Sequence, residues 1–135
     1  MKKRQNIPSG SIWEERAGYS RAVRFGDMVC ISGTTASDES GHVHGSDARE
    51  QSLYIFRKIE RALLQAGASL NDVVRTRIYV SDLAHWEGAA YAHKEIFGDI
   101  MPANTLIGGI HFPGTGYLVE IEADAIIGAG ASQAE

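Results

Sequence analysis

The stretch LVEIEADAII, residues 118–127, has the clearest structural pattern in the chain because it alternates between apolar and acidic side chains. The acids at positions 120, 122 and 124 share one face of an extended chain, and the residues between them share the other. A strand with one buried face has this period of two. Acids at every second position lie about 7 Å apart and repel one another unless a cation, a metal, solvent or a reaction compensates them. The stretch therefore predicts a half-buried strand with an acidic open face.

The segments around this strand predict an α+β domain with the element order ββαβαββ. Strands are expected over residues 19–24, 28–32, 73–80, 105–111 and 117–127. One helix is expected to begin after Ser46 or Asp47 and to end at Gly67, and a second to run from Ser81 or Asp82 to Gly98. The predicted architecture is a mixed sheet with two helices on one face. The domain is expected to span 1–135, with a core over about 18–127, an N-terminal extension over 1–17 and a frayed tail over 128–135.

The two helices cover only one face of the predicted sheet, so we expect other residues or another subunit to cover the second face. Arg75 and Arg77 share one face of the strand over 73–80, so we expect them to lie opposite the acids of the last strand. The simplest interpretation is a structural ladder of charges. A homo-oligomer that packs its sheets around a common axis would bury this face, with small-molecule sites between the subunits.

Composition excludes several functions. The net charge is −4 with no basic stripe, which disfavours nucleic-acid binding. Cys30 is the only cysteine, so no disulfide is expected, and a reducing, cytoplasmic location is predicted. The sequence shows no signal segment and no run of 18 apolar residues, so no membrane span is expected. His42 and His44 lack a third ligand at a recognisable spacing, so no metal is predicted.

A set of short motifs in a fixed order resembles the RidA/YjgF family across about residues 18–127. The matching pieces are GYS at 18–20, ISGT at 31–34, Gln51, AGA at 66–68, VVR at 73–75, YVSDL at 79–83, Phe97, PANT at 102–105 and VEIEA at 119–123. The resemblance implies a chorismate-mutase-like fold, a homotrimer and clefts at the subunit interfaces. It also implies hydrolysis of reactive enamines and imines to keto acids and ammonia, without a metal or an organic cofactor.

The resemblance also implies roles for individual residues. Glu120 matches the glutamate that activates water, and we expect burial or neighbouring acids to raise its pKa. Ser32 and Gly33 match the segment that lines the cleft, and Tyr19 matches an aromatic residue near the substrate. Trp86 is a further candidate for an apolar cleft wall. Sequence assigns no role to the histidines at positions 93 and 111.

One departure from the family pattern concerns the substrate. Asn104 stands where relatives that act on amino-acid-derived imines carry an arginine that holds the substrate carboxylate, and a neutral amide cannot replace that charged fork. Whether Arg24, Arg75 or Arg77 replaces it is left open. The sequence thus predicts a deaminase for an imine or enamine other than 2-aminoacrylate. The alternative is a non-catalytic trimer that binds a small metabolite or a protein partner. A ribonuclease activity, assigned to some relatives, gains little support from the acidic charge.

Overall fold

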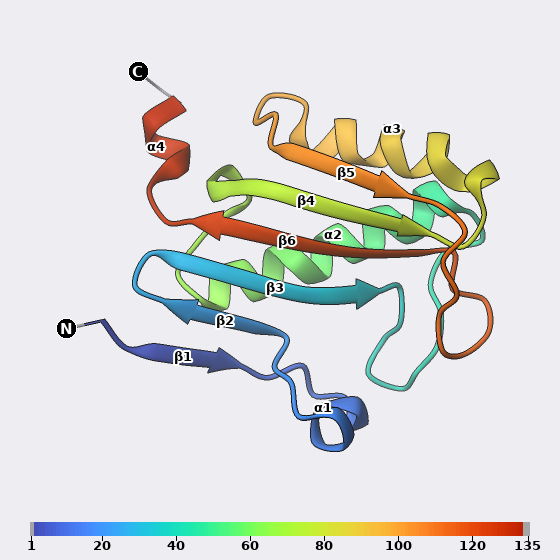
Figure 1. Cartoon of the computed structure of the whole chain (residues 1–135), viewed down its shortest axis with the longest axis horizontal. Coiled ribbons are helices and arrows are strands. Elements are labelled where there is room, and N and C mark those ends of the chain that lie inside the picture. Colours follow the sequence, from blue (N-terminus) through green and yellow to red (C-terminus); the bar gives the residue numbers. More distant parts are fainter. Residues whose placement is uncertain (1, 134–135) are drawn as a thin grey trace.

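The computed structural model describes residues 2–133 and has one six-stranded mixed sheet with helices packed on one face (Figure 1). The strands follow the order β1-β2-β3-β6-β4-β5, and only β4 and β5 pair in parallel. The strands are β1 (Arg4–Ile7), β2 (Ala22–Phe25), β3 (Met28–Thr35), β4 (Val73–Val80), β5 (Ala103–Ile107) and β6 (Val119–Ile126). The helices are α1 (Ile12–Ala17), α2 (Ala48–Gln65), α3 (Trp86–Phe97) and α4 (Ala129–Gln133), with short 3-10 turns at Leu70–Asp72 and Leu83–His85. The α+β prediction is confirmed.

Helices α2 and α3 cover the apolar face of the sheet because their buried residues recur every three or four positions. In α2, Ile55, Phe56, Ile59 and Leu63 are fully buried against the strands. The Asp47 side chain caps this helix by accepting a hydrogen bond from the backbone N–H of Glu50 at 2.8 Å. Within residues 2–133, no helix is both long enough and apolar enough to cross a bilayer.

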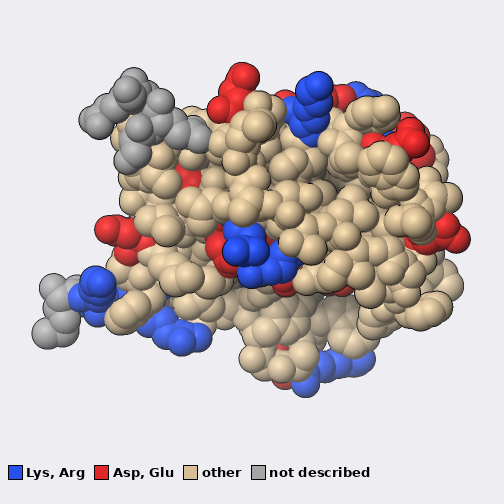
Figure 2. All heavy atoms as spheres, turned by 45° about the horizontal axis from the view of Figure 1, so that its top comes forward, with Lys and Arg blue, Asp and Glu red and all other residues tan. Residues whose placement is uncertain are grey.

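Strand β6 has the predicted two-faced pattern. Its residues at 119, 121, 123 and 125 are fully buried, whereas the three acids lie half-buried on the open face. Arg77 forms ion pairs with two of these acids: its Nη1 lies 3.4 Å from Oε1 of Glu122 and 3.2 Å from Oδ2 of Asp124. The predicted ladder of charges therefore exists for this arginine. Arg75 is exposed and forms no ion pair within the described chain. Figure 2, which views the sheet obliquely, shows one mixed group of charges near the middle of a mostly uncharged surface.

Within residues 2–133, helices and a strand also lie outside the predicted core over about 18–127. The extension over 1–17 contributes β1, which pairs with β2, and α1. The strand was missed because RQNI has a single apolar residue, Ile7, and is stabilised mainly by backbone pairing. The tail contains α4, which Asp72 holds by accepting hydrogen bonds from the backbone N–H groups of Gly128 and Gly130. Residues 134 and 135 lie outside the described part.

A bulge in β3 changes which side chains face the core. Strand β6 pairs Ala123 with Ile31 and Ile121 with Thr34, so Ser32 and Gly33 together oppose one residue. The extra residue shifts the alternation, and Thr34 and Ala36 are buried where an unbroken strand would bury positions 33 and 35. Thr35 therefore lies on the open face, paired with Glu120.

The fully buried amide of Gln51 joins α2 to two loops. Its Nε2 donates to the carbonyls of Gly45 and Gly116, and its Oε1 accepts from the backbone N–H of Leu118 at 3.0 Å. These loops, over 36–47 and 108–118, form two walls of the pocket described below. Gln51 thus fixes the site from within the core.

Replacing Gln51 by Leu should lower the free energy of unfolding by about 2–5 kcal/mol, because it leaves buried backbone groups without partners. Urea denaturation of the variant measures this loss. Gln65→Leu is the matched control: Gln65 is exposed at the end of the same helix, and its replacement should change the free energy by less than about 0.5 kcal/mol. Equal effects of the two substitutions would contradict this role of Gln51.

Candidate active site

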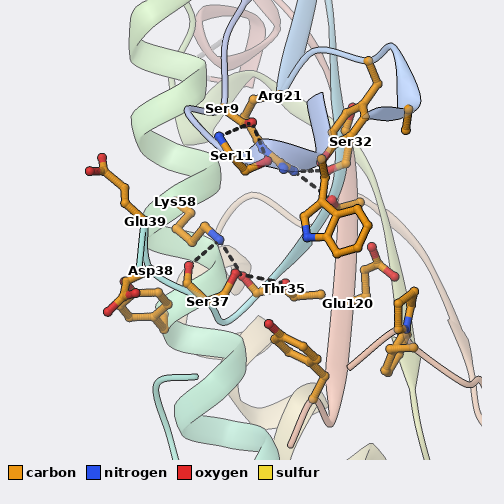
Figure 3. A pocket seen from close by; sticks show the side chains of 18 of the residues that line it. Ser9, Ser11, Arg21, Ser32, Thr35, Ser37, Asp38, Glu39, Lys58 and Glu120 are labelled. Carbon is orange, nitrogen blue, oxygen red and sulfur yellow. Dashed lines mark hydrogen bonds between the residues drawn. The ribbon is translucent and has the colours of Figure 1, made fainter. Parts of the chain in front are cut away.

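A pocket of about 830 Å³ lies where β3 extends beyond β2. Strand β2 ends its pairing with β3 at Ile31, so the second half of β3 pairs on one side with β6 and borders the pocket on the other. Residues from the α1 region, α2, β6 and the two loops complete the walls, as Figure 3 shows. The volume is in the range of pockets that enclose small organic ligands.

Glu120 lines this pocket and has no bonding partner. Its half-buried carboxylate makes no hydrogen bond or ion pair within the described chain, unlike Glu122, which accepts a hydrogen bond from the Tyr79 hydroxyl at 2.9 Å. Burial raises the pKa of Glu120, Arg21 opposes this effect, and Glu122 reinforces it. The upward direction agrees with the sequence-based expectation. An unpaired carboxylate with a raised pKa is suited to accept and return a proton.

The β3 bulge brings Ser32 and Gly33 to the same pocket. A Cβ atom on Gly33 would lie 2.6 Å from Oε1 of Glu120, so a larger residue would push the carboxylate out of its present position. Ser32 lines the pocket, but its hydroxyl donates to the carbonyl of Ser20 at 2.6 Å. That bond ties the bulge to the segment before β2.

Tyr19 also lines the pocket, so four of the six predicted site residues come together. Beside it stands Arg21, with its guanidinium carbon 5.8 Å from the centre of the Tyr19 ring. Nη1 of Arg21 donates to the carbonyl of Gly33 at 2.7 Å and to the hydroxyl of Thr34 at 2.8 Å. Arg21 therefore holds the bulge from the side opposite β6.

Three basic residues of the pocket, Arg21, Lys58 and Arg61, were missed by the sequence reasoning. Arg21 was overlooked because it precedes β2 and belongs to no motif. Lys58 lies on α2 among helix-surface charges, and its side chain reaches the end of β3, where Nζ donates to the carbonyls of Thr35 and Ser37, both at 2.7 Å. Burial lowers the pKa of Lys58 to about 8, with contributions from Arg21 and Arg61. No spacing rule would have connected these residues before the fold was known.

The other predicted residues do not line this pocket. Asn104 on β5 donates to the hydroxyl of Thr76 at 2.9 Å, and Thr76 is in turn bonded to His93 of α3. The amide thus lies on the helix-covered side of the sheet, away from Glu120. Trp86 begins α3 and is exposed. A role for either residue in this site requires a second subunit.

The three arginines considered as replacements are also elsewhere. Arg24 donates to the carbonyls of Gly26 and Ala66, Arg77 pairs with acids of β6, and Arg75 is exposed. None of them lines the pocket. The cations that do line it are Arg21, Lys58 and Arg61.

Two histidines, His93 and His44, pack against aromatic rings. His93 is half-buried between Phe56 and Phe97, and burial lowers its pKa. His44 is 2.9 Å from Asp38 and stacks on Tyr54, and an isolated bridge between Ser37 and Val43 closes this loop. Among residues 2–133, no group of three His, Cys, Asp or Glu side chains is arranged to hold a metal ion.

Comparisons with known proteins agree with this geometry. Residues 11–127 match the family described as endoribonuclease L-PSP. An uncharacterized protein of Streptomyces coelicolor is 34% identical over 125 residues, covering 93% of each chain. The 3-aminoacrylate deaminase RutC of Acinetobacter baylyi is 32% identical over 104 residues, covering 76% of this chain and 82% of the relative.

A solved structure extends the match to three dimensions. The crystal structure of Rv2704 from Mycobacterium tuberculosis, described as a member of the YjgF/YER057c/UK114 family, is 45% identical with a TM-score of 0.84. The similarity covers 93% of this chain and all of Rv2704. From the sheet order, the motifs and these matches, we conclude that the chain belongs to the endoribonuclease L-PSP family, also called the YjgF/RidA family.

Proposed function

We propose that this protein is a hydrolytic deaminase of a reactive imine or enamine, with Glu120 as its proton-transfer group. The observation that carries the proposal is the unpaired, half-buried Glu120 carboxylate, which lies in a ligand-sized pocket and has a raised pKa. In the described chain the other acids of β6 have partners, so Glu120 alone of the three is left for chemistry.

The chemistry requires one group that accepts and returns a proton. Glu120 as the carboxylate takes a proton from water while the water oxygen bonds to the carbon of the C=N group, and it gives this proton to the nitrogen as the C=N π bond breaks. In the resulting carbinolamine, Glu120 takes the hydroxyl proton as the C=O bond forms and passes it to the nitrogen, which leaves as ammonia when the C–N bond breaks. The products are a carbonyl compound and ammonia, and an enamine enters after tautomerising to the imine. No step needs a metal or an organic cofactor.

Two points bear on the substrate. The relative from Acinetobacter baylyi bears the name of a 3-aminoacrylate deaminase, which supports this class of reaction. Asn104 nevertheless replaces the family arginine, so we expect a substrate that is held differently from 2-aminoacrylate.

We also propose that the working form is a homotrimer. Large apolar side chains on the open sheet face are solvent-exposed in the single chain, among them Phe25, Met28 and Ile126. Packing three open faces around one axis would bury them and would bring a second subunit to the pocket. Light scattering should give three times the chain mass of 14.6 kDa. A monomer at micromolar concentration would refute this assembly.

The alternative is a non-catalytic trimer that binds a metabolite or a protein partner. One observation favours it: the amide of Asn104 is bonded to Thr76 and contributes nothing to the pocket of its own chain. The test is the loss of imines generated in situ, including 2-iminopropionate. Hydrolysis no faster than in buffer across a varied panel would favour this alternative. A cytoplasmic location remains a prediction.

Changing Glu120 to Gln should lower kcat for imine hydrolysis by about 10²–10⁴-fold, the usual contribution of a positioned proton-transfer group. In the wild type, activity should rise with pH through the pKa of Glu120, above the ordinary value of 4.5. Glu122→Gln is the matched control, because this acid on the same face is bonded to Tyr79. It should retain kcat within a few-fold and move the acidic limb to lower pH, because Glu122 helps to raise the pKa of Glu120. Equal rates for Glu120→Gln and wild type would overturn the mechanism.

The same Glu120→Gln substitution should stabilise the fold at neutral pH. The folded-state pKa of Glu120 is raised, so the protonated form is favoured in the folded state, and its stabilisation is lost as the pH rises through that pKa. Gln resembles the protonated acid at every pH. Thermal unfolding should therefore show a higher Tm for the variant at pH 7 and a difference that shrinks below pH 4.5. A variant that is less stable than wild type at pH 7 would contradict the inference that burial destabilises the ionised Glu120 carboxylate.

Gly33→Ala should reduce activity by at least about 10-fold, because the new methyl group occupies the position of the Glu120 carboxylate and displaces it from the reacting geometry. It should also lower stability. In the double variant with Glu120→Ala the clash is absent, so the stability loss from Gly33→Ala should become smaller. A loss of the same size with and without Glu120 would show that the two residues do not compete for space.

A further inference from the structure

Three basic side chains line the pocket that contains Glu120: Arg21, Lys58 and Arg61. Arg21 and Lys58 are half-buried. In the described chain none of the three forms an ion pair with a carboxylate, whereas Arg49 and Arg77 elsewhere do. Buried cations are rare in proteins unless an anion pairs with them. The pocket therefore holds positive charge that lacks an anionic partner.

Lys58 has hydrogen-bonding capacity left for a ligand. An ammonium group has three N–H donors. Two of them bond to the carbonyls of Thr35 and Ser37, which hold Nζ at the pocket wall without neutralising it. Figure 3 shows Lys58 reaching into the pocket from α2, on the side opposite Glu120.

Arg21 also has N–H donors left for a ligand. Its bonds to Ser32, Gly33 and Thr34 all come from Nη1. Nε and Nη2 have no acceptor among the described residues. The edge of the guanidinium group that carries these two nitrogens is therefore available to a ligand. A guanidinium edge with two free donors suits a carboxylate, which it can bind with two parallel hydrogen bonds.

Among the described residues, no acid of the pocket forms an ion pair with Arg21 or Lys58. Asp38 accepts hydrogen bonds from the backbone N–H groups of Ser40 and His42 and lies 2.9 Å from Nε2 of His44, so its oxygens are already in use. Glu39 is exposed. Glu120 lies on the side of the pocket opposite Lys58 and forms no hydrogen bond or ion pair with either cation in the described chain, although the charge of Arg21 acts on its carboxylate.

We propose that Arg21 and Lys58 bind the carboxylate of an organic anion in this pocket, in place of the arginine that Asn104 has replaced. The apolar body of the ligand packs against the aromatic side chains that line the pocket, Trp13, Tyr54, Phe112 and Tyr117. The pocket is large enough to hold an aromatic or long aliphatic group. The identification of this ligand as an imino acid rests on the proposed function, but the binding of the anion does not.

The charge of Lys58 makes this binding sensitive to pH. The groups that act on its ammonium are Arg21 before β2, Arg61 on α2 and Asp38 in the loop over 36–47. Since the pKa of Lys58 is about 8, half of its charge is lost near that pH. Affinity for an anion should fall as the pH rises through this value, and Lys58→Arg should remove the effect.

The test compares two stable probes of nearly equal shape, 3-phenylpropionate and 3-phenylpropionamide, by calorimetry on the full chain. At pH 7 the carboxylate should bind about 10- to 100-fold more tightly than the amide, as expected for a charge-assisted contact. The ratio should narrow at pH 9.5 in the wild type and persist in Lys58→Arg. Propionate, which lacks the aromatic body, should bind more weakly than 3-phenylpropionate.

Variants then locate the contact. Arg21→Gln and Lys58→Gln should each reduce the ratio of carboxylate affinity to amide affinity, measured on the same variant, by about 10-fold or more. Arg57→Gln is the matched control, because Arg57 is an exposed residue next to Lys58 that does not line the pocket. It should retain the preference.

Equal affinity of the wild type for the two probes would overturn the proposal without any variant, even if a Gln variant fails to fold. Folded Arg21→Gln and Lys58→Gln proteins that keep the full preference would overturn it as well. The outcome is separate from catalysis: selective binding of 3-phenylpropionate without imine hydrolysis would keep this proposal and reject the deaminase. Imine hydrolysis without selective binding of 3-phenylpropionate would keep the deaminase and reject this proposal.

Discussion

The candidate site depends on one steric constraint, the close approach of the Gly33 backbone to the Glu120 carboxylate. The bulge at Ser32 and Gly33 places two residues of β3 opposite one residue of β6. It turns Thr34 into the core and leaves Thr35 beside Glu120. A regular strand would direct residue 33 towards the core and would change both the packing and the pocket. The irregularity is therefore part of the site rather than a defect of the sheet.

The surroundings divide the charges of β6 into two groups. Glu122 and Asp124 have Arg77 and Tyr79 within bonding distance, so they stabilise the open face. Glu120 is one step further along the same face, where β4 offers it no bonding partner and the cavity begins. Its burial without a partner costs stability, and such a cost is typical of groups retained for chemistry. Lys58 lies across the cavity and, like Arg21, forms no ion pair within residues 2–133, so the pocket offers both an acid and cations to a polar ligand.

The sequence predicted the parts of the fold that repeat regularly. The alternation in β6 and the spacing of apolar residues in α2 both reflect burial of one face, and the structure has both. Short polar β1 was missed because backbone pairing leaves almost no signal in four residues. The strand expected over 105–111 lies at Ala103–Ile107, since Gly108 and Gly109 follow directly and favour a turn. Arg21 and Lys58 were missed as site residues because only the folded chain brings the segment before β2 next to the middle of α2. The departure from the family pattern at Asn104 stays a prediction. The position of Asn104 on the helix side of β5 depends on strand register, which the sequence does not reveal.

Within the described chain, Glu120 is an unpaired carboxylate, and its environment favours the protonated form. The most direct measurement is a carbon-13 NMR titration of the side-chain carboxyl carbons, with the Glu120 signal assigned from Glu120→Gln. We expect the Glu120 carboxyl to titrate with a midpoint above the ordinary value of 4.5. A midpoint at or below 4.5 would mean that Glu120 has a stabilising partner in solution, which contradicts an unpaired carboxylate at this site.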